Sequence, residues 1–369
     1  MAEIEAQKKF ACPMCGGEAR WDAGRQTLVC AYCGTVTPAT VDAVSGEIRE
    51  HDLAAALRGV PDTERGWMTE TRSVRCQSCQ AISVFPVGQA AGRCAFCGSG
   101  ALVDYREMRA PIRPESLLAF RISETQVRDA VRQWYGSRWF APNRLKTAAL
   151  TDTIHGVYLP FWTFDAQADC RWTAEAGYHY YETETYTENG QQQTRRVQHT
   201  RWENASGQVR HFFDDELVPA SKGVPANLIE RIAPFPTVEQ LVPYEPKYLS
   251  GWTVEQYQID LSDAAKRAED TMTDELRGMC SREVPGDTQR GLQIYPRYDA
   301  RTFKHVLLPV WVLSYNYVGT PFQVLINGYT GKIAGRYPKS WIKITLLVLV
   351  ILIIVAIVLV LRAQHGHGG

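Results

Sequence analysis

Cys12-Pro13-Met14-Cys15-Gly16 and Cys30-Ala31-Tyr32-Cys33-Gly34 contain two Cys-x2-Cys loops, with fourteen residues between the loops. The same arrangement returns at Cys76 and Cys79, followed by Cys94 and Cys97. A Cys-x2-Cys loop turns both sulfurs onto one ion, and two such loops supply the closed tetrahedral thiolate set that structural zinc prefers. The sequence therefore predicts two structural Zn2+ sites in tandem rubredoxin-like zinc ribbons, with these eight cysteines as ligands.

Two other interpretations of the cysteines stay open. In an oxidising compartment they could pair as disulfides, and Cys12-Pro13-Met14-Cys15-Gly16 is also typical of rubredoxin-type iron sites. We favour zinc because Met1 to Ala11 lacks an apolar secretion signal, and because the loops of an iron site are expected to lie further apart. Gly34 and Gly98, directly after the second loop of each ribbon, suit a left-handed backbone turn under the metal.

The other end of the sequence is apolar. Residues Ile344 to Leu361 form an uncharged run of eighteen residues whose single hydroxyl belongs to Thr345. At a rise of about 1.5 Å per residue, such a helix reaches roughly the thickness of a bilayer core. Trp341 and Lys343 add an interfacial ring and a base at its start. We expect a transmembrane tail anchor over 341–362 and a short tail over 363–369.

The distribution of basic residues predicts the orientation in the membrane. Lys332, Arg336, Lys339 and Lys343 precede the apolar run with no acid among them, whereas Arg362 is the one strong base after it. The segment richer in bases stays in the cytoplasm, where reductants keep thiols free for metal. We therefore expect a single-pass protein of the inner membrane whose N-terminal body lies in the cytoplasm.

Turn signals and composition divide the remaining chain. We expect a zinc ribbon over 1–40, a helical spacer over 41–70, a second ribbon over 71–105, an α+β unit with a long β-meander over 106–224 and a second α+β unit over 225–340. Ser123 and Gln126 form a capping box for a helix in the first unit. The meander over 157–213 should turn at Glu188-Asn189-Gly190 and again at Gly207. Its aromatic residues favour cross-strand pairing over a binding face.

The second unit repeats the order of the first. A strand over Trp252–Ile259 precedes a helix that Ser262 should cap, and Leu308-Pro309-Val310-Trp311 repeats the pattern of Leu159-Pro160-Phe161-Trp162. Recurrence of one strand, helix and strand order predicts a duplication. The expected fold class is therefore α+β, with two ribbons, a duplicated antiparallel body and one C-terminal transmembrane helix.

Several further motifs carry a resemblance to a known family. They are the paired ribbons, Trp139-Phe140-Ala141-Pro142, Tyr158 to Phe164, Thr302-Phe303-Lys304-His305, the Leu-Pro-x-Trp element at 308–311, and Asn327-Gly328-Tyr329-Thr330-Gly331-Lys332 before the apolar run. In nearly its whole length the chain resembles bacterial membrane-anchored proteins with a transcription-factor-IIB-type zinc ribbon, some of which are labelled replication or primosomal proteins. The resemblance implies an association with band-7 (SPFH) scaffold proteins and phage-shock-type membrane proteins.

The charge distribution argues against the replication label. Residues 1–110 hold 12 basic and 13 acidic side chains, whereas binding to nucleic acid depends on an excess of lysine and arginine. Each four-thiolate zinc site adds a further charge of about minus two. Phosphate-binding loops of the Gly-x4-Gly-Lys-[Ser/Thr] type are also missing from the sequence, which excludes a helicase motor of that class.

Catalytic patterns do not stand out either. Cys170 and Cys280 are single thiols of the kind that usually pack as small apolar side chains, and Asp214-Asp215-Glu216 is typical of a charged turn. The sequence predicts neither an enzyme nor a small-molecule substrate. We expect a non-enzymatic, zinc-binding, tail-anchored adapter that docks cytoplasmic proteins at the membrane. The alternative hypothesis is a membrane-tethered nucleic-acid-binding protein, for which the acidic balance is unfavourable.

Overall fold

The structure is a computed structural model, and the residues it describes are 10–37, 48–67, 70–87, 92–106, 110–142, 154–188 and 191–365. Their helices and strands, in chain order, are β1 (Ala19–Asp22), β2 (Thr27–Cys30), β3 (Val36–Thr37), β4 (His51–Asp52), α1 (Leu53–Arg58), η1 (Asp62–Glu64), β5 (Thr71–Cys76), β6 (Ile82–Pro86), β7 (Leu102–Tyr105), β8 (Ser116–Leu117), α2 (Glu124–Gly136), β9 (Ile154–Glu188), β10 (Gln191–Pro219), α3 (Ala226–Ile232), α4 (Thr237–Gln240), β11 (Val242–Pro243), η4 (Pro246–Leu249), β12 (Thr253–Glu255), α5 (Leu261–Glu283), β13 (Thr288–Tyr317), β14 (Thr320–Asn327), β15 (Ile333–Gly335) and α6 (Trp341–His365).

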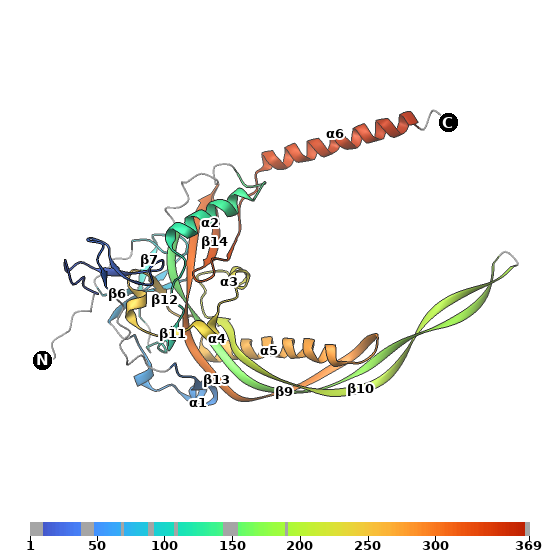
Figure 1. The fold of residues 1–369 in the computed structure, drawn as a ribbon, viewed down its shortest axis with the longest axis horizontal. Coiled ribbons are helices and arrows are strands. Elements are labelled where there is room, and N and C mark those ends of the chain that lie inside the picture. Colours follow the sequence, from blue (N-terminus) through green and yellow to red (C-terminus); the bar gives the residue numbers. More distant parts are fainter. Residues whose placement is uncertain are drawn as a thin grey trace.

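Two long antiparallel strands, β9 and β13, form the centre of the fold (Figure 1). They pair from Ile154 opposite Leu313 to Gly177 opposite Thr288. Strand β12 joins β9 and strand β8 joins β13, both in parallel. The resulting 12-stranded sheet has the order β11-β8-β13-β9-β12-β6-β5-β7 along its main path. The α+β fold class predicted from the sequence is therefore confirmed.

The two Leu-Pro-x-Trp elements lie opposite each other in this strand pair. Leu159 faces Leu308, so a two-fold axis between these residues relates one element to the other. The same axis relates their neighbours, because β12 pairs with β9 up to the residue before Leu159, and β8 pairs with β13 up to the residue before Leu308. Each half thus consists of a short strand, a helix, a long strand and a hairpin return, which is the arrangement expected for a duplicated body.

The two motif tryptophans connect the halves. Trp162 donates its Nε1–H to the carbonyl of Ile259 at 2.9 Å, and Trp311 donates its Nε1–H to the carbonyl of Ile122 at 3.0 Å. Ile259 lies directly before the N-cap of α5, and Ile122 directly before the N-cap of α2. Each tryptophan therefore holds the start of the helix that belongs to the other half, and both rings are buried.

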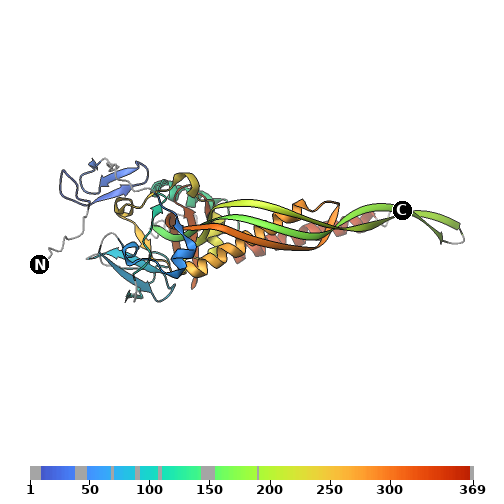
Figure 2. The same ribbon diagram turned by 90° about the horizontal axis from the view of Figure 1, so that it is seen from below.

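Away from this centre, β9, β10 and β13 continue as a curved, twisted arm (Figures 1 and 2). Helix α5 covers one face of its base, where Ala268, Met272 and Leu276 share an apolar cluster with Trp172. Pairing with β13 ends at Gly177, and beyond that point β9 and β10 form a two-stranded ribbon. The arm is thus packed at its base and much thinner at its tip.

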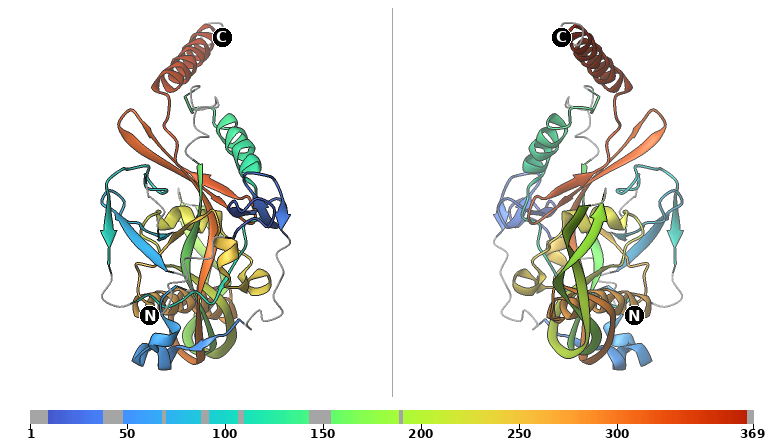
Figure 3. Two further views of the ribbon diagram at one scale, coloured as in Figure 1. Left: turned by 90° about the vertical axis from the view of Figure 1, so that its left-hand side faces the viewer. Right: turned by 90° about the vertical axis from the view of Figure 1, so that its right-hand side faces the viewer.

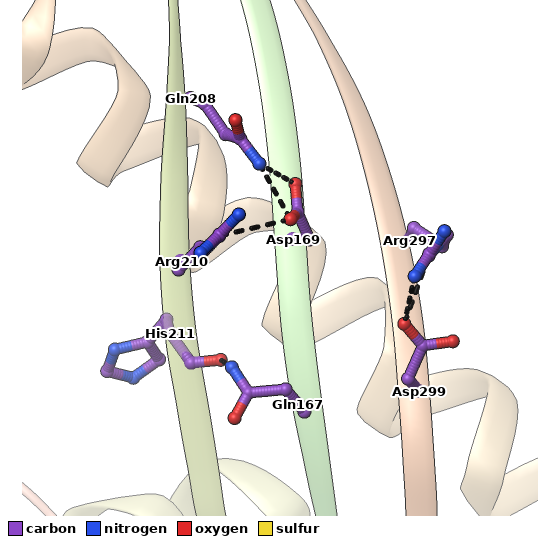
Figure 4. A network of polar contacts seen from close by, with 7 residues as sticks. All are labelled: Gln167, Asp169, Gln208, Arg210, His211, Arg297 and Asp299. Atoms are coloured by element: carbon purple, nitrogen blue, oxygen red, sulfur yellow. Dashed lines mark hydrogen bonds and ion pairs between the residues drawn. The ribbon is translucent and has the colours of Figure 1, made fainter.

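The face of the arm opposite α5 is polar. Asp169 accepts hydrogen bonds from Gln208 and Arg210 of the neighbouring strand, and Arg297 pairs with Asp299 at 2.7 Å on the third strand (Figure 4). Cross-strand pairs of this kind stabilise a sheet face that is open to water.

The two ribbons lie on opposite sides of the body (Figure 3). The first has a three-stranded sheet of its own, β1-β2-β3, and stands on η4 through an edge contact between the rings of Trp21 and Tyr248 at 4.7 Å. Strands β5, β6 and β7 of the second belong to the 12-stranded sheet, because β6 pairs with β12. The domain boundaries expected from the sequence stay predictions.

Local expectations from the sequence had mixed outcomes. The capping box of Ser123 is confirmed. Gly207 does not mark a turn, because it lies inside β10 opposite Trp172, whose ring would be 2.5 Å from an added Cβ. Asp260, not Ser262, is the N-cap of α5, and the preceding strand is shorter than expected. Of the predicted hairpin tip, Asn189 and Gly190 lie outside the described residues, and Glu188 pairs with Gln191.

Helix α6 extends from the body on the same side as the arm (Figures 1 and 2). Its segment Trp341–Leu359 has a mean hydropathy of 3.3 and none of it is buried against the rest of the protein. By length and composition this helix can cross a membrane. Its first turn is held by Lys343, which donates from Nζ to the carbonyls of Trp139 and Ala141 at 3.0 and 2.8 Å.

Candidate metal centres

The four Cys-x2-Cys loops have one backbone geometry. In each, the carbonyl of the first cysteine accepts a hydrogen bond from the N–H four residues later, at 2.8 to 3.0 Å. The donors of these bonds are Gly16, Gly34, Gln80 and Gly98, and each has a positive φ between 64° and 73°. The left-handed glycines predicted after the second loops are therefore confirmed. Gln80 adopts the same conformation without the freedom of glycine, so a glycine pattern alone does not reveal the first loop of the second ribbon.

This geometry gathers the sulfurs into two groups of four. In each group the four Sγ atoms lie within 4.8 Å of one another. The closest pairs are Cys12 with Cys33 and Cys15 with Cys30, both at 3.5 Å, and Cys76 with Cys97 and Cys79 with Cys94, both at 3.6 Å. A regular tetrahedron with metal–sulfur bonds of about 2.3 Å has sulfur–sulfur edges of about 3.8 Å. Both groups can therefore hold a tetrahedral metal ion.

The pKa values of the sulfurs are shifted in opposite directions within each group. Hydrogen bonds from the hydroxyl and N–H of Thr35 lower the pKa of Cys33 to about 6. In the second group, the hydrogen bond from Cys79 lowers the pKa of Cys94 to about 5, and the same contact raises the pKa of Cys79. Thiolates this close repel one another unless a counter-charge lies among them. A divalent ion supplies that charge and keeps a coordinating thiol deprotonated.

The first group lies near solvent. Cys12 and Cys30 are buried, whereas Cys15 and Cys33 are exposed. This ribbon contacts the body through a few bonds, among them Ser250 Oγ to the carbonyl of Ala19 at 2.9 Å. Its buried residues Ala19, Trp21, Ala23 and Leu28 share an apolar cluster with residues of the body such as Leu117 and Phe120. The sheet of the first ribbon is therefore packed on the body, while its cysteine group lies near solvent.

The second group is built into the body. Cys76 and Cys94 are buried, and so is Phe96 between the second pair of ligands. The carbonyl of Phe96 accepts hydrogen bonds from Ser314 of β13 and from Gln323 of β14, the latter at 3.0 Å. These bonds tie a metal-binding loop directly to the central sheet.

A cleft opens beside this second group. It has a volume of about 770 Å³ and is lined by Cys79 and Cys97, by the apolar rings of Tyr315 and Phe322, and by Arg336. Ligand sites of globular proteins have volumes of about 300–1,000 Å³. Sequence patterns did not reveal the cleft, because its walls come from three segments that are far apart in the chain.

A third set of possible metal ligands lies at the base of the arm. Its members are Asp165, Asp214 and Asp215. The charged turn predicted over 214–216 is wrong, because β10 continues through a bulge at these residues and Asp215 is buried with a φ of 55°. Lys304 Nζ lies 2.8 Å from Asp215 Oδ1 and 3.1 Å from Glu50 Oε1. The lysine ammonium thus supplies the positive charge that these acids require.

The two remaining cysteines are also brought together. Cys170 of β9 and Cys280 of α5 are both buried, and their sulfurs lie 3.7 Å apart. The sequence predicted small buried side chains at both positions, and this is confirmed. Their proximity was not predicted, because 110 residues separate them in the chain.

Comparisons with known proteins give one relative. Over 339 residues the chain is 25% identical to the uncharacterized protein YdjG of Bacillus subtilis (strain 168), and the match covers 91% of each chain. No protein-family model matches the chain, and no solved structure matches it. At this identity the similarity assigns neither a family nor an activity. The membrane-anchored zinc-ribbon family inferred from motifs stays a prediction.

Proposed function

We propose that this protein is a zinc-binding, membrane-anchored adapter that holds cytoplasmic proteins at the inner membrane and catalyses no reaction. The observation that carries the proposal is the combination of two four-cysteine groups with an exposed apolar helix on the same chain. A closed tetrahedral thiolate site leaves no coordination position for a substrate. Such a site stabilises the fold of its ribbon and thus the surface that the ribbon presents to partners. Helix α6 would hold that surface at the bilayer.

Zinc is the proposed metal because of the donor set. Four thiolates in a tetrahedral arrangement suit Zn2+ or iron, and a cytoplasmic location keeps cysteines reduced for either. Each ribbon is too small to bury a sufficient core, so metal binding would supply much of its folding free energy. Metal analysis of the purified protein separates the candidates, since two zinc ions and no iron per chain are expected.

Insertion of α6 into the membrane restricts the direction in which the arm can point. The arm carries charged residues such as Glu184 and Arg195, which cannot enter the hydrocarbon core without a large cost. Because α6 and the arm extend on one side of the body, the inserted helix would have to turn away from the arm. The coil over 336–340, directly before α6, is the segment where this turn would occur.

Docking surfaces for partners are available on the body. The cleft beside the second cysteine group combines apolar rings with Lys222 and Arg336, two exposed bases. The predicted partners are band-7 (SPFH) scaffold proteins and phage-shock-type membrane proteins, and this prediction comes from the family resemblance. A nucleic-acid-binding function is the alternative, and the balance of 12 basic and 13 acidic side chains in residues 1–110 is unfavourable for it.

The test is an affinity purification of the tagged full-length protein from mild detergent, with and without nuclease. We expect band-7 or phage-shock-type proteins to co-purify in near-stoichiometric amounts, to survive nuclease and to be lost when Arg336 and Phe322 are both replaced by alanine. Retained metal content in that variant would show that the ribbons stay folded. Recovery of replication or transcription proteins that disappears with nuclease would instead establish the alternative function.

A further inference from the structure

The tip of the arm is a two-stranded ribbon without a supporting layer. Residues 178–187 of β9 and 192–201 of β10 pair with each other in regular register, and α5 ends at Glu283 beside the base of the arm. Among the described residues, hydrogen bonds and ion pairs of 180–200 stay within the ribbon itself. An isolated two-stranded ribbon is marginally stable in water. Its length is therefore difficult to explain unless it gains contacts elsewhere.

Both edges of the ribbon are open. Strand β13 pairs with β9 only up to Gly177, and within the described residues β10 pairs with β9 alone. Proteins usually protect such edges with charged side chains, lysine above all, with proline or with a bulge. Residues 178–201 contain no proline and no lysine, and the bulge of β10 lies at the base of the arm, between Phe213 and Glu216. The edges thus keep their backbone groups available for another strand.

The charges of the two edges are complementary. Residues 178–187 of β9 contain Glu182 and Glu184 and no lysine or arginine. Residues 192–202 of β10 contain Arg195, Arg196 and Arg201 and no acid. An acidic strand beside a basic strand is favourable, and two like strands side by side are not. The acidic edge of one ribbon therefore fits the basic edge of a second, identical ribbon.

We propose that the arm tip is a self-assembly site, at which the β9 edge of one copy pairs antiparallel with the β10 edge of the next. Antiparallel pairing continues the alternation of strand directions, so all arms point the same way and all bodies lie at one end. Each copy uses a different edge toward each neighbour, which makes the contact head-to-tail and leads to a ring or an open row. The proposal requires neither the metal nor the membrane anchor.

The experiment measures the mass of the full-length protein in mild detergent by light scattering. We expect assemblies of several copies for the native sequence. A variant in which 179–200 is replaced by Asn-Gly should be monomeric, with at least tenfold weaker association, while metal content and the unfolding temperature of the body stay unchanged. A monomeric native protein, or a shortened variant that still assembles, would overturn the proposal, since association through α6 or the body survives that change.

Charge reversal then tests the pairing of edges. The variants E182R/E184R and R195E/R196E should each be monomeric, because the two edges then have net charges of the same sign. Each also loses the internal pair of Arg195 with Glu184, which lies at 2.9 Å. The fourfold variant E182R/E184R/R195E/R196E restores that pair and exchanges the two edges, so it should assemble like the native protein. Failure of the fourfold variant to assemble would contradict complementary edge pairing.

Discussion

The two cysteine groups have identical ligand spacing and different surroundings. The first belongs to a ribbon with its own three-stranded sheet, and two of its cysteines are exposed. The second belongs to a ribbon whose strands are part of the 12-stranded sheet. Corresponding aromatic residues show the difference most directly, because Tyr32 is 77% exposed and Phe96 is 0% exposed.

This difference shows what a ligand pattern does and does not specify. The spacing of cysteines determines that four sulfurs meet, because each loop closes with the same local hydrogen bonds. The residues between the ligands make the contacts to the body. These contacts determine whether the metal site stabilises only its ribbon or also the body. The two ribbons have the same cysteine spacing in the sequence, whereas the structure gives them different surroundings.

The largest effect should come from replacing a buried ligand in each group. Cys94→Ser and Cys30→Ser should each lower the zinc content from two ions to one. Binding of structural zinc is worth about 10–16 kcal/mol in isolated fingers, while a whole domain is stable by about 5–15 kcal/mol. Because the second ribbon belongs to the central sheet, we expect Cys94→Ser to lower the unfolding temperature of the body more than Cys30→Ser does.

Metal analysis and thermal unfolding followed by circular dichroism measure both quantities on one sample. Membrane insertion of the two variants serves as the control, because α6 lies outside both ribbons. Equal destabilisation of the body by the two replacements would show that the first ribbon is as well integrated as the second.

A smaller effect is expected from the two aromatic residues. Phe96→Ala removes a fully buried ring from the core and should destabilise the body by about 3–5 kcal/mol. Tyr32→Ala removes a ring that is mostly in solvent and should change the stability by less than about 0.5 kcal/mol. Chemical denaturation of the two variants at a fixed zinc concentration gives both values. Similar losses in the two variants would contradict the difference in burial on which this comparison rests.

The motif tryptophans offer a comparison between the halves of the body. Trp162→Phe and Trp311→Phe each replace a buried indole by a smaller ring and leave one carbonyl without its donor. The lost hydrogen bond should cost about 1–3 kcal/mol, and the cavity adds to this loss. The two-fold relation between the halves predicts similar losses of stability for the two variants. A large loss at one position and none at the other would show that the bonds to Ile259 and Ile122 are not equivalent.

Much of this architecture was predictable because its signals are local. Cysteine spacing, the capping box at Ser123 and the apolar run before Arg362 each concern residues within a few turns or one loop. The duplication was also predictable, since Leu-Pro-x-Trp occurs twice. For the cysteine loops, the capping box and the apolar run, the pattern and the structure it predicts lie on the same short segment.

The unpredicted features depend on partners that are distant in sequence. Gly207 resembles a turn residue, but its lack of a side chain makes room for the ring of Trp172 on the adjacent strand. Asp215 resembles a surface acid, but the bulge in β10 brings it to Lys304. The cleft and the pair of Cys170 with Cys280 likewise form only when remote strands meet. A single sequence does not show directly which of its distant residues come into contact.

The last prediction concerns a buried acid behind the second ribbon, whose effect depends on pH. Glu255 of β12 is 0% exposed; burial raises its pKa to about 8, although hydrogen bonds from Ser221 and Gly223 favour the charged form. An unfolded glutamate has a pKa of about 4.3. Between these values the folded protein holds a proton that the unfolded chain releases, so this contribution to stability is complete below about pH 4.3 and decreases as the pH rises toward 8.

Glu255→Gln tests this directly, because an amide resembles the protonated carboxyl and does not titrate. The free energy of unfolding of the variant, minus that of the native protein, should increase between pH 5 and pH 8 by at most about 1.4 kcal/mol per pH unit. Zinc binding also depends on pH, so both proteins are compared at the same saturating zinc concentration. A difference that stays constant from pH 5 to pH 8 would mean that Glu255 is ionised beneath the second cysteine group. Water or a cation would then have to reach it there, and the second ribbon would be less tightly packed against the body than the burial of Phe96 indicates.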